Sequence, residues 1–177
     1  MMQPATTQAQ DLVLSYFPGC SLHSSAREYD ASTRAVCEAV GIELHELEDW
    51  NCCGSTSAHS LDRELARLLP MRNLEIAERA GLDVLVPCAA CYGRSKAAEA
   101  DFAEAKGDPE GPNKFAISHI LDVFTRPDVM DVLRTKITSP LTGLRTVCYY
   151  GCLTGRPPKV TGALDHEAPE SMDRLVE

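Results

Sequence analysis

The stretch Leu82-Asp83-Val84-Leu85-Val86-Pro87-Cys88-Ala89-Ala90-Cys91 sets a short apolar run directly before a turn and a spaced pair of cysteines. A run of this length, with glycine before it and proline after it, predicts a buried strand over residues 82–86. The alanine-rich, charged sequence from Cys91 onward predicts a helix. The cysteine pair therefore falls at a junction between strand and helix, where the helix amides favour thiolate.

The same alternation of strand and helix extends in both directions along the chain. Further strands are predicted over residues 12–17, 42–47 and 144–149, and helices over residues 24–41, 60–81, 117–124 and 129–137. Pro70 is expected to break or kink the helix over 60–81. Strands that alternate with helices predict an α/β fold, in which a mainly parallel sheet is flanked by helices on both faces.

Cysteines follow the ends of the predicted strands. Cys20, Cys52, Cys53, Cys88 and Cys152 each lie just after one of them. The carboxyl ends of parallel strands meet at one edge of a sheet, and binding sites collect there. Cysteines that are distant in the sequence are therefore expected to gather at a single edge.

The bulk composition limits the class of protein. The chain has 177 residues, 44% hydrophobic and 24% charged, with a formal net charge of −9 at pH 7, which fits a soluble globular protein. The acidic balance argues against a nucleic-acid or anionic-membrane partner, and no apolar run is long enough to cross a bilayer. The N-terminus lacks the basic start and apolar core of a secretion signal, so a cytoplasmic location is expected.

The eight cysteines are the outlying feature. Disulfides rarely persist in a reducing compartment, and a Cys-x-x-Cys pair there indicates metal binding or redox chemistry. The adjacent pair Cys52-Cys53 needs a tight turn to aim both sulfurs at one group, and Gly54 supplies the backbone freedom. Five converging thiolates exceed the four that a zinc ion or a cubane cluster takes. An iron–sulfur group is favoured, and a structural zinc site stays open as the alternative.

A cysteine, Cys-Cys-Gly and Cys-x-x-Cys at intervals of about thirty residues resemble the signature of the cysteine-rich CCG domain. That domain occurs in the B subunit of heterodisulfide reductase, in iron–sulfur subunits of glycolate and lactate oxidases, and in some succinate dehydrogenase subunits. The chain resembles the heterodisulfide reductase B subunit in particular, over nearly its whole length. The matching motifs are Tyr-Phe-Pro-Gly-Cys at 16–20, Asn-Cys-Cys-Gly at 51–54, Pro-Cys-Ala-Ala-Cys-Tyr at 87–92, Tyr-Tyr-Gly-Cys-Leu-Thr-Gly-Arg-Pro-Pro at 149–158 and Pro-Glu-Ser-Met-Asp-Arg-Leu-Val at 169–176.

The resemblance implies a noncubane [4Fe-4S] cluster on Cys20, Cys52, Cys53, Cys88 and Cys91. It implies reductive cleavage of a thiol disulfide, of the coenzyme M–coenzyme B type, between two such clusters that each pass one electron. The implied partners are the C subunit of heterodisulfide reductase, which has cubane clusters, and its flavin-bearing A subunit. Two alternatives are kept: an electron-transfer module of a 2-hydroxy-acid oxidase or succinate dehydrogenase type complex, and a zinc-stabilised scaffold.

The sequence Tyr-Tyr-Gly-Cys at 149–152 repeats the pattern of residues 16–20 and indicates the start of a second copy of the unit. We expect a disordered tail over residues 1–10, a first CCG domain over 11–142 and the start of a truncated second CCG domain over 143–177. Of the ligands of the second cluster only Cys152 is present. That cluster is therefore expected to be incomplete and to leave the isolated chain without activity.

Four other residues carry weaker signals. Cys37, on an apolar helix face, and Cys148, in a predicted strand, are interpreted as buried core thiols. His23 and His59 each follow a cysteine of the predicted site closely. Either could hydrogen-bond a sulfide or pass a proton to a leaving thiolate, although a solvated or structural histidine is the commoner case.

Overall fold

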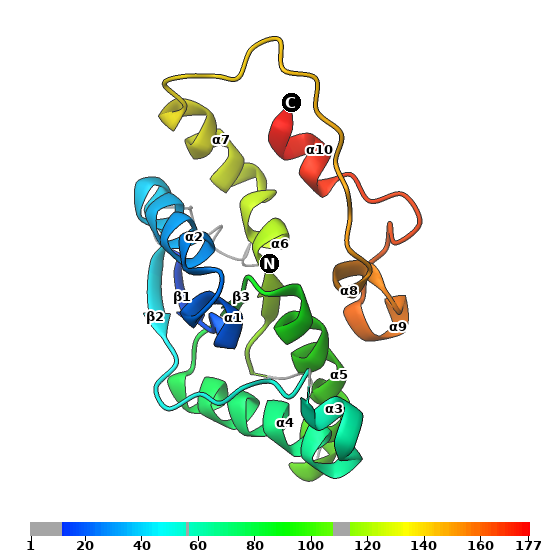
Figure 1. Cartoon of the computed structure of the whole chain (residues 1–177). Coiled ribbons are helices and arrows are strands. Elements are labelled where there is room, and N and C mark those ends of the chain that lie inside the picture. Colours follow the sequence, from blue (N-terminus) through cyan, green and yellow to red (C-terminus); the bar gives the residue numbers. More distant parts are fainter. Residues whose placement is uncertain (1–11, 56, 108–113) are drawn as a thin grey trace, which may run out of the picture.

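The computed structural model describes residues 12–55, 57–107 and 114–177; the predicted tail over 1–10 lies outside the described residues. Its centre is a four-stranded, all-parallel sheet with the strand order β2-β1-β3-β4 (Figure 1). The predicted α/β fold with a parallel sheet is confirmed. The strands are β1 (Val13–Tyr16), β2 (Glu43–Glu46), β3 (Val84–Val86) and β4 (Ile117–His119).

Helices connect the strands and continue after the sheet. Those in the described residues are α1 (Gly19–His23), α2 (Arg27–Val40), α3 (Ser57–Leu61), α4 (Arg63–Ala80), α5 (Ala89–Ala105), α6 (Ile120–Phe124), α7 (Pro127–Lys136), α8 (Cys152–Gly155), α9 (Pro158–Thr161) and α10 (Ser171–Val176). The helices α2 and α4 end at Gly41 and Gly81, as predicted. The predicted start of α2 at Ser24 or Ser25 was wrong, because residues 19–23 form the separate short helix α1 and Ala26 precedes α2.

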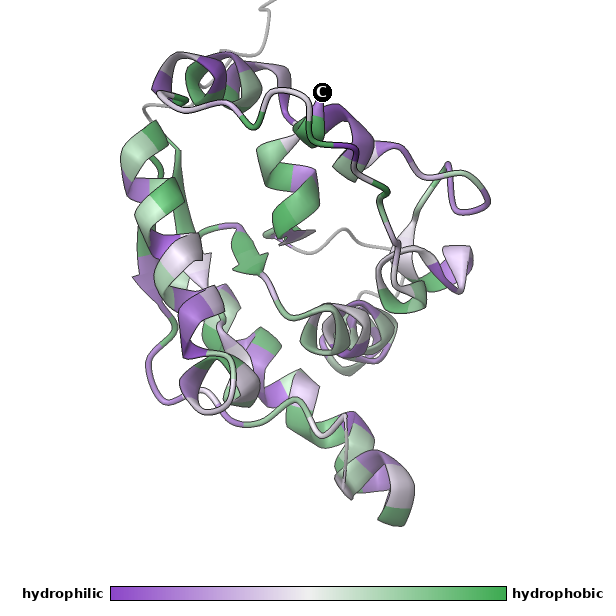
Figure 2. Cartoon of the chain, turned by 45° about the horizontal axis from the view of Figure 1, so that its top comes forward, coloured by the Kyte–Doolittle hydropathy of each residue, from purple (hydrophilic) through white to green (hydrophobic). Residues whose placement is uncertain are grey.

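The sheet is covered on both faces. Leu14, Tyr16 and Leu85 pack with residues of α2, α6 and α7 on one face, and Val84 and Val86 pack with residues of α4 and α5 on the other. Successive residues of a strand point to opposite faces, so a strand covered on both faces is a continuous apolar run, as β3 is. Figure 2 shows hydrophobic residues along α6, which α10 contacts.

Helix α4 runs through Pro70 without interruption, so the predicted break was wrong. Proline has no backbone N–H, and its position in a helix leaves the carbonyl four residues earlier, here that of Ala66, without its usual donor. The Arg94 side chain from α5 fills this gap, because its Nη2 donates to the Ala66 carbonyl at 2.7 Å. A tertiary contact thus replaces the missing helical hydrogen bond.

The stretch predicted as a helix over 117–124 divides into two elements. Its first three residues form β4, paired in parallel with β3, and the helix α6 starts at Ile120. His119 ends the strand and caps the helix: its ring accepts from the Leu121 N–H, and the Asp122 carboxylate accepts from the His119 N–H. A strand of three residues next to a capped helix is too short for hydrophobic periodicity to separate the two.

The strand predicted over 144–149 is absent from the described residues, where this segment is irregular. Val147 and Tyr149 are 95% and 90% exposed. A strand needs a neighbouring strand to pair its backbone, and this segment pairs with neither edge of the sheet, β2 or β4. Cys152 therefore follows an irregular segment, not a strand, and it begins α8, which contacts α5.

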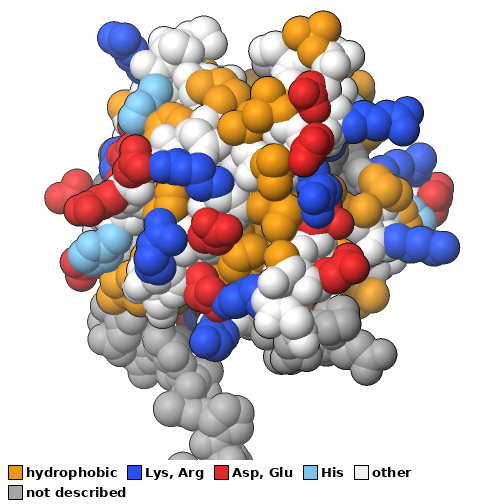
Figure 3. Space-filling view, turned by 90° about the horizontal axis from the view of Figure 1, so that it is seen from below, with side chains coloured by type: hydrophobic (Ala, Val, Ile, Leu, Met, Phe, Trp, Pro, Cys, Tyr) orange, Lys and Arg blue, Asp and Glu red, His pale blue; other side chains and the backbone are white. Residues whose placement is uncertain are grey.

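Hydrophobic side chains also reach the surface on α3 and α4. Leu61, Leu65 and Leu68 are exposed. Figure 3 views the molecule from the side on which α4 lies in Figure 1, and hydrophobic side chains gather in the middle of that face with charged ones around them. Apolar patches rimmed by charge are typical of contact surfaces. Within the described residues, no helix is both long and apolar enough to cross a membrane.

Candidate metal centre

The strand order places a topological switch point between β1 and β3. The chain leaves β1 toward β2 on one side and later returns to β3 on the other side of β1. Ligands of open parallel sheets bind at such a switch point, beyond the carboxyl ends of the strands. Cys20 follows β1 and Cys88 follows β3, so both cysteines come from loops that flank this position.

Two of the predicted cysteines face each other across neighbouring loops. The sulfurs of Cys20, on α1, and Cys52, in the loop after β2, are 3.8 Å apart. Burial raises the pKa of the Cys52 thiol, while the Gly54 N–H acts in the opposite direction. The loops after β1 and β2 thus bring these two thiols into direct contact, as the parallel pairing of the two strands requires.

A second group of thiols forms around Cys91. Its thiol hydrogen-bonds to the sulfurs of both Cys53 and Cys88, which lowers the pKa of Cys53 to about 7 and that of Cys88 to about 6, and raises the pKa of Cys91 itself. The Ala90 and Cys91 amides at the start of α5 also donate to the Cys88 sulfur. Cys53 and Cys91 are 3% and 2% exposed. Three sulfurs thus lie together at the start of α5, two of them almost fully buried and one partly exposed.

Gly19 joins the two groups of thiols. Its φ is +75°, a conformation that other residues rarely adopt, and a Cβ placed on it would lie 2.6 Å from the Cys91 sulfur and 3.9 Å from the Cβ of Cys88. The backbone next to Cys20 therefore passes directly over the Cys88–Cys91 pair. All five cysteines predicted to form one site, Cys20, Cys52, Cys53, Cys88 and Cys91, are linked by these contacts.

The Cys52-Cys53 loop is held against α4 by a pair of asparagines. The Asn51 N–H donates to the Asn73 carbonyl oxygen Oδ1 at 2.9 Å, and Asn73 Nδ2 donates to the Asn51 carbonyl at 2.7 Å. Asn51 Nδ2 in turn donates to the carbonyls of Cys52 and Leu69. Asn73 is only 2% exposed. A fully paired, buried polar contact of this kind fixes the position of the loop.

A polar network ties the Cys20 helix to the Cys52 loop. The Glu46 carboxylate, at the end of β2, accepts from Trp50 Nε1 at 3.0 Å and lies 3.1 Å from His23 Nε2. Arg34 of α2 pairs with the same carboxylate. Burial alone would raise the pKa of Glu46, but the hydrogen bonds from Trp50 and Arg34 outweigh it and lower the pKa. His23 is on the helix of Cys20, and Trp50 is two residues before Cys52, so Glu46 connects both.

The remaining cysteines are arranged differently. Cys37 is fully buried in the core, as interpreted from the sequence, and burial raises its pKa to about 11. Cys148 is only partly covered, so its interpretation as a core thiol was wrong. The reason is that its predicted strand does not form, and its thiol instead lies next to Asp173. His59, on α3, lies 3.4 Å from a guanidinium nitrogen of Arg94.

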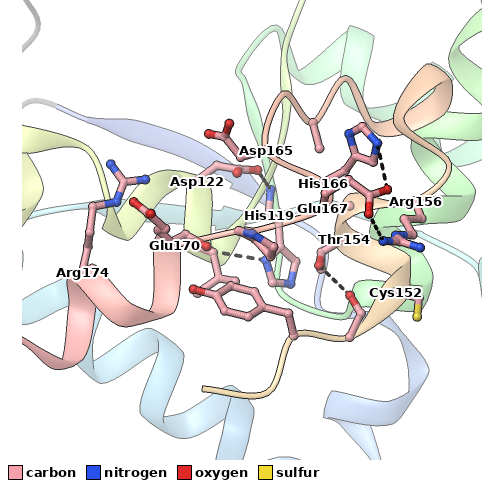
Figure 4. A pocket seen from close by; sticks show the side chains of 17 residues that line it. His119, Asp122, Cys152, Thr154, Arg156, Asp165, His166, Glu167, Glu170 and Arg174 are labelled. Atoms are coloured by element: carbon pink, nitrogen blue, oxygen red, sulfur yellow. Dashed lines mark hydrogen bonds and ion pairs between the residues drawn. The ribbon is translucent and has the colours of Figure 1, made fainter. Parts of the chain in front are cut away.

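Cys152 lies apart from the five. It is exposed and lines a cavity of about 470 Å³ between α6, α8 and the C-terminal segment, and none of the five cysteines lines that cavity. Figure 4 shows charges of both signs around it, including the ion pair of Arg156 with Glu167 at 3.3 Å. His119 also lines this cavity, while its Nε2 contacts the Pro87 carbonyl at 3.0 Å. The structure thus separates Cys152 from the candidate centre.

All five predicted ligands at this site are cysteines. In residues 12–55, 57–107 and 114–177, no three His, Cys, Asp or Glu side chains surround a position for a single metal ion. The five thiols instead form two contact groups joined at Gly19, and thiolates are the ligands that iron–sulfur clusters use. The Nε of Arg94 is buried without a hydrogen-bond partner among the described residues, and sulfur atoms of a cluster would accept from such a donor. The residues present therefore fit an iron–sulfur group.

Comparison with known proteins agrees with this geometry. Residues 14–94 match the family model of the cysteine-rich CCG domain, and this range contains all five cysteines of the centre. The match to the family model ends at Arg94 on α5, whose Nε has no hydrogen-bond partner among the described residues.

Relatives extend the match beyond the CCG domain. The chain is 30% identical over 171 residues to the 8-methylmenaquinol:fumarate reductase membrane anchor subunit of Wolinella succinogenes, which covers 91% of this chain and 60% of that protein. It is 28% identical over 180 residues to the B subunit of the ferredoxin/F(420)H(2)-dependent CoB-CoM heterodisulfide reductase of Methanosarcina acetivorans. It is 29% identical over 182 residues to the B subunit of the ferredoxin:CoB-CoM heterodisulfide reductase of Methanosarcina mazei. Each of these two matches covers 93% of this chain and 59% of the relative.

These matches confirm the resemblance to the heterodisulfide reductase B subunit inferred from the cysteine motifs. The chain spans about 60% of the length of the curated relatives that it matches. It is similar over most of its length both to heterodisulfide reductase B subunits and to a fumarate reductase membrane anchor subunit. Sequence reasoning found all five cysteines but missed Asn73, Glu46 and Arg94, because these polar residues become recognisable only through their contacts.

Proposed function

We propose that this chain is the iron–sulfur subunit of a heterodisulfide reductase type complex, with a noncubane [4Fe-4S] cluster on Cys20, Cys52, Cys53, Cys88 and Cys91. The observation that carries the proposal is the meeting of these thiols at the switch point of the sheet within a CCG domain. The bound cluster would supply electrons one at a time for reductive cleavage of a thiol disulfide, of the coenzyme M–coenzyme B type.

The residues of the chain have separate parts in this proposal. The five cysteines hold the metal group, and the low pKa of Cys53 and Cys88 favours the thiolate form that metals bind. The contacts of Asn51 with Asn73, and of Glu46 with His23 and Trp50, fix the loops that present the thiols. Buried surroundings of Cys53 and Cys91 exclude water from the inner side of the site.

The partners proposed for the chain are the heterodisulfide reductase C subunit, with its cubane clusters, and the flavin-bearing A subunit, in the cytoplasm. The apolar surface of α3 and α4, next to the Cys52-Cys53 loop, offers a contact area for one of these partners. We assign residues 11–142 to the first unit and residues 143–177 to the start of a second unit, in which Cys152 would serve the second cluster. The repeat of the Tyr-Tyr-Gly-Cys pattern supports this division.

Metal analysis tests the proposal directly. The chain is purified without oxygen, iron and zinc are measured, and EPR spectra are recorded. We expect about four iron atoms per chain and an EPR signal that is lost when any of the five cysteines is replaced by serine. The matched controls are Cys37→Ser and Cys148→Ser, which should keep iron. A chain that holds zinc alone would overturn the redox function and leave the zinc-stabilised scaffold.

A second function is favoured by one observation. The fumarate reductase anchor subunit of Wolinella succinogenes reaches 30% identity, which supports an electron-transfer module without a disulfide substrate. The two functions are separated in the native complex of this chain, pulled down from its own cells. Reduction of a mixed thiol disulfide by that complex supports the first function, and electron transfer to fumarate without disulfide reduction supports the second.

A further inference from the structure

Arg94 is a partly buried cation whose Nε the cysteine site leaves unexplained. It lies on α5, three residues after Cys91, and it contacts His59 on α3 and Ala66 on α4. Its Nη2 donates to the Ala66 carbonyl at 2.7 Å, and its Nη1 lies 3.4 Å from His59 Nδ1. Its Nε is buried and has no partner among the described residues. One of the three guanidinium nitrogens is therefore held in the interior without an acceptor.

The position of this guanidinium is fixed by the fold. The Ala66 carbonyl needs a donor from outside α4, because Pro70 cannot supply the helical N–H. The Nη2 of Arg94 supplies this donor. Because the guanidinium group is planar and rigid, this hydrogen bond also fixes the direction of the Nε–H. Arginine stays charged in proteins, and a buried donor without an acceptor destabilises the fold. Such a group calls for an acceptor that belongs to the site.

Sulfur is the acceptor that the surroundings indicate. Arg94 is three residues after Cys91 on α5, and its neighbour His59 donates its backbone N–H to the carbonyl of Gly54, next to Cys53. No carboxylate in the described part of the chain forms an ion pair with Arg94, whereas Arg67 on α4 pairs with Asp101. The charge of Arg94 is therefore not neutralised by a carboxylate among the described residues.

We propose that Arg94 tunes the reduction potential of the metal group at this site, by donating its Nε–H to a sulfur atom there and by placing a fixed positive charge beside Cys53. This inference rests on the proposed iron–sulfur function. Reduction adds negative charge to a cluster, and both a nearby cation and a hydrogen bond to sulfur stabilise the reduced form. Arg94 therefore raises the potential at which the site accepts an electron.

The test is a redox titration of the full chain, loaded with iron and purified without oxygen, followed by EPR. Arg94→Gln removes the charge, and Arg94→Lys keeps a charge but loses the planar fork. Arg67→Gln is the matched control, since it removes a cation from the neighbouring helix that is already paired with Asp101. His59→Ala is a second control, because it removes the Nη1 neighbour and leaves the charge of Arg94 in place.

We expect the midpoint potential to shift to more negative values in Arg94→Gln, to shift less in Arg94→Lys, and to stay unchanged in Arg67→Gln and His59→Ala. An unshifted potential in Arg94→Gln with full iron content would overturn the role of Arg94 and leave the iron–sulfur function intact. If circular dichroism shows that Arg94→Gln does not fold, Arg94→Lys decides, and an unshifted potential there overturns the proposal. A wild-type chain without iron would overturn both the function and this inference.

Discussion

At the scale of single residues, the site depends on a few positions where no other side chain fits. Gly19 is the clearest case, because its backbone lies against the Cys91 sulfur with φ at +75°. Asn73 is another, since it pairs with both backbone groups of Asn51 in a buried position. These residues are not ligands, yet the distances between the thiols follow from them.

Replacing Gly19 with alanine should abolish or strongly reduce iron binding. The positive φ alone costs roughly 1–2 kcal/mol for a residue with a Cβ, and the added carbon would also meet the Cys91 sulfur at 2.6 Å. Gly81→Ala is the matched control, because its φ is +72° but nothing lies within 4 Å of an added Cβ. Both variants should lose stability in denaturant unfolding, and only Gly19→Ala should lose iron. Equal iron content in the two variants would contradict the close contact.

His119 should make the stability of the chain depend on pH. Its Nε2 shares a hydrogen bond with the Pro87 carbonyl, and burial lowers its pKa below the usual 6.5, against the weaker effect of Asp122. The unfolded chain therefore takes up a proton at a higher pH than the folded chain. The contribution of His119 is complete above pH 6.5 and is lost as the pH falls from there through the folded pKa.

The measurement is urea unfolding of the metal-free chain under reducing conditions, at pH 7.5 and pH 5.5. In the wild type, the free energy of unfolding should be lower at pH 5.5 than at pH 7.5. In His119→Asn this decrease should be smaller. His45→Asn provides the control, because His45 is about half exposed and pairs only with Glu43 at the surface. The same pH dependence in wild type and His119→Asn would contradict the assignment.

At the scale of elements, the site is assembled from loops that follow β1, β2 and β3. The loops after β1 and β2 are joined by the carboxylate of Glu46, which contacts His23 and Trp50. The loop after β2 is also fixed to α4, and α4 is fixed to α5 by Arg94. The loops and helices that carry the thiols are thus held together by hydrogen bonds and ion pairs that do not involve the cysteine side chains.

Glu46→Gln should loosen the pair Cys20 and Cys52 without unfolding the chain. The carboxylate is about one-third exposed, so the loss of its charged contacts should destabilise the fold by roughly 1 kcal/mol or less. Iron should leave the site about fivefold faster, as 1 kcal/mol corresponds to that factor. The rate is measured by iron transfer to a chelator, with Glu43→Gln on the same strand as the control. Equal rates in both variants would refute the role of the network.

At the scale of the whole molecule, the metal group would link loops that are far apart in the sequence. Cys20, on α1, and Cys91, on α5, lie near opposite ends of the stretch that matches the CCG family model, and five other elements lie between them. A ligand that binds only the folded chain adds to its stability. The centre would therefore act as a structural cross-link as well as a redox site.

Removal of iron should lower the melting temperature of the chain. At a free ligand concentration of about 100 times Kd, binding contributes roughly 2.7 kcal/mol, and each kcal/mol shifts the melting temperature by about 2–4 °C for a chain of this size. Chelator-treated and untreated protein are compared by circular dichroism under argon. Cys53→Ser should melt at the same temperature with and without chelator. A wild-type melting temperature that does not respond to chelator would contradict the cross-link.

Much of this architecture follows from local sequence signals. The apolar runs before Cys20, Cys52 and Cys88 predicted three of the four strands, and Gly41 and Gly81 predicted two helix ends. Once the strands were taken as parallel, the gathering of the cysteines followed, because their positions depend on topology more than on side-chain detail.

The errors arose where distant contacts decide the structure. The strand predicted over 144–149 has strand-forming residues but no neighbouring strand among the described residues. Helix α4 passes through Pro70 because Arg94, on another helix, supplies the missing donor. Neither fact is visible in a window of ten or fifteen residues, and the same holds for the pairing of Asn51 with Asn73.

The close approach of Cys20 and Cys52 makes the metal-free chain sensitive to air. With their sulfurs 3.8 Å apart and both side chains reachable from solvent, dissolved oxygen can convert them to a disulfide after only a small movement. The oxidised pair would then be unable to accept iron, so a preparation handled on the open bench would seem inert until a strong reductant had been added. Handling without oxygen would keep Cys20 and Cys52 in the reduced form that can bind iron.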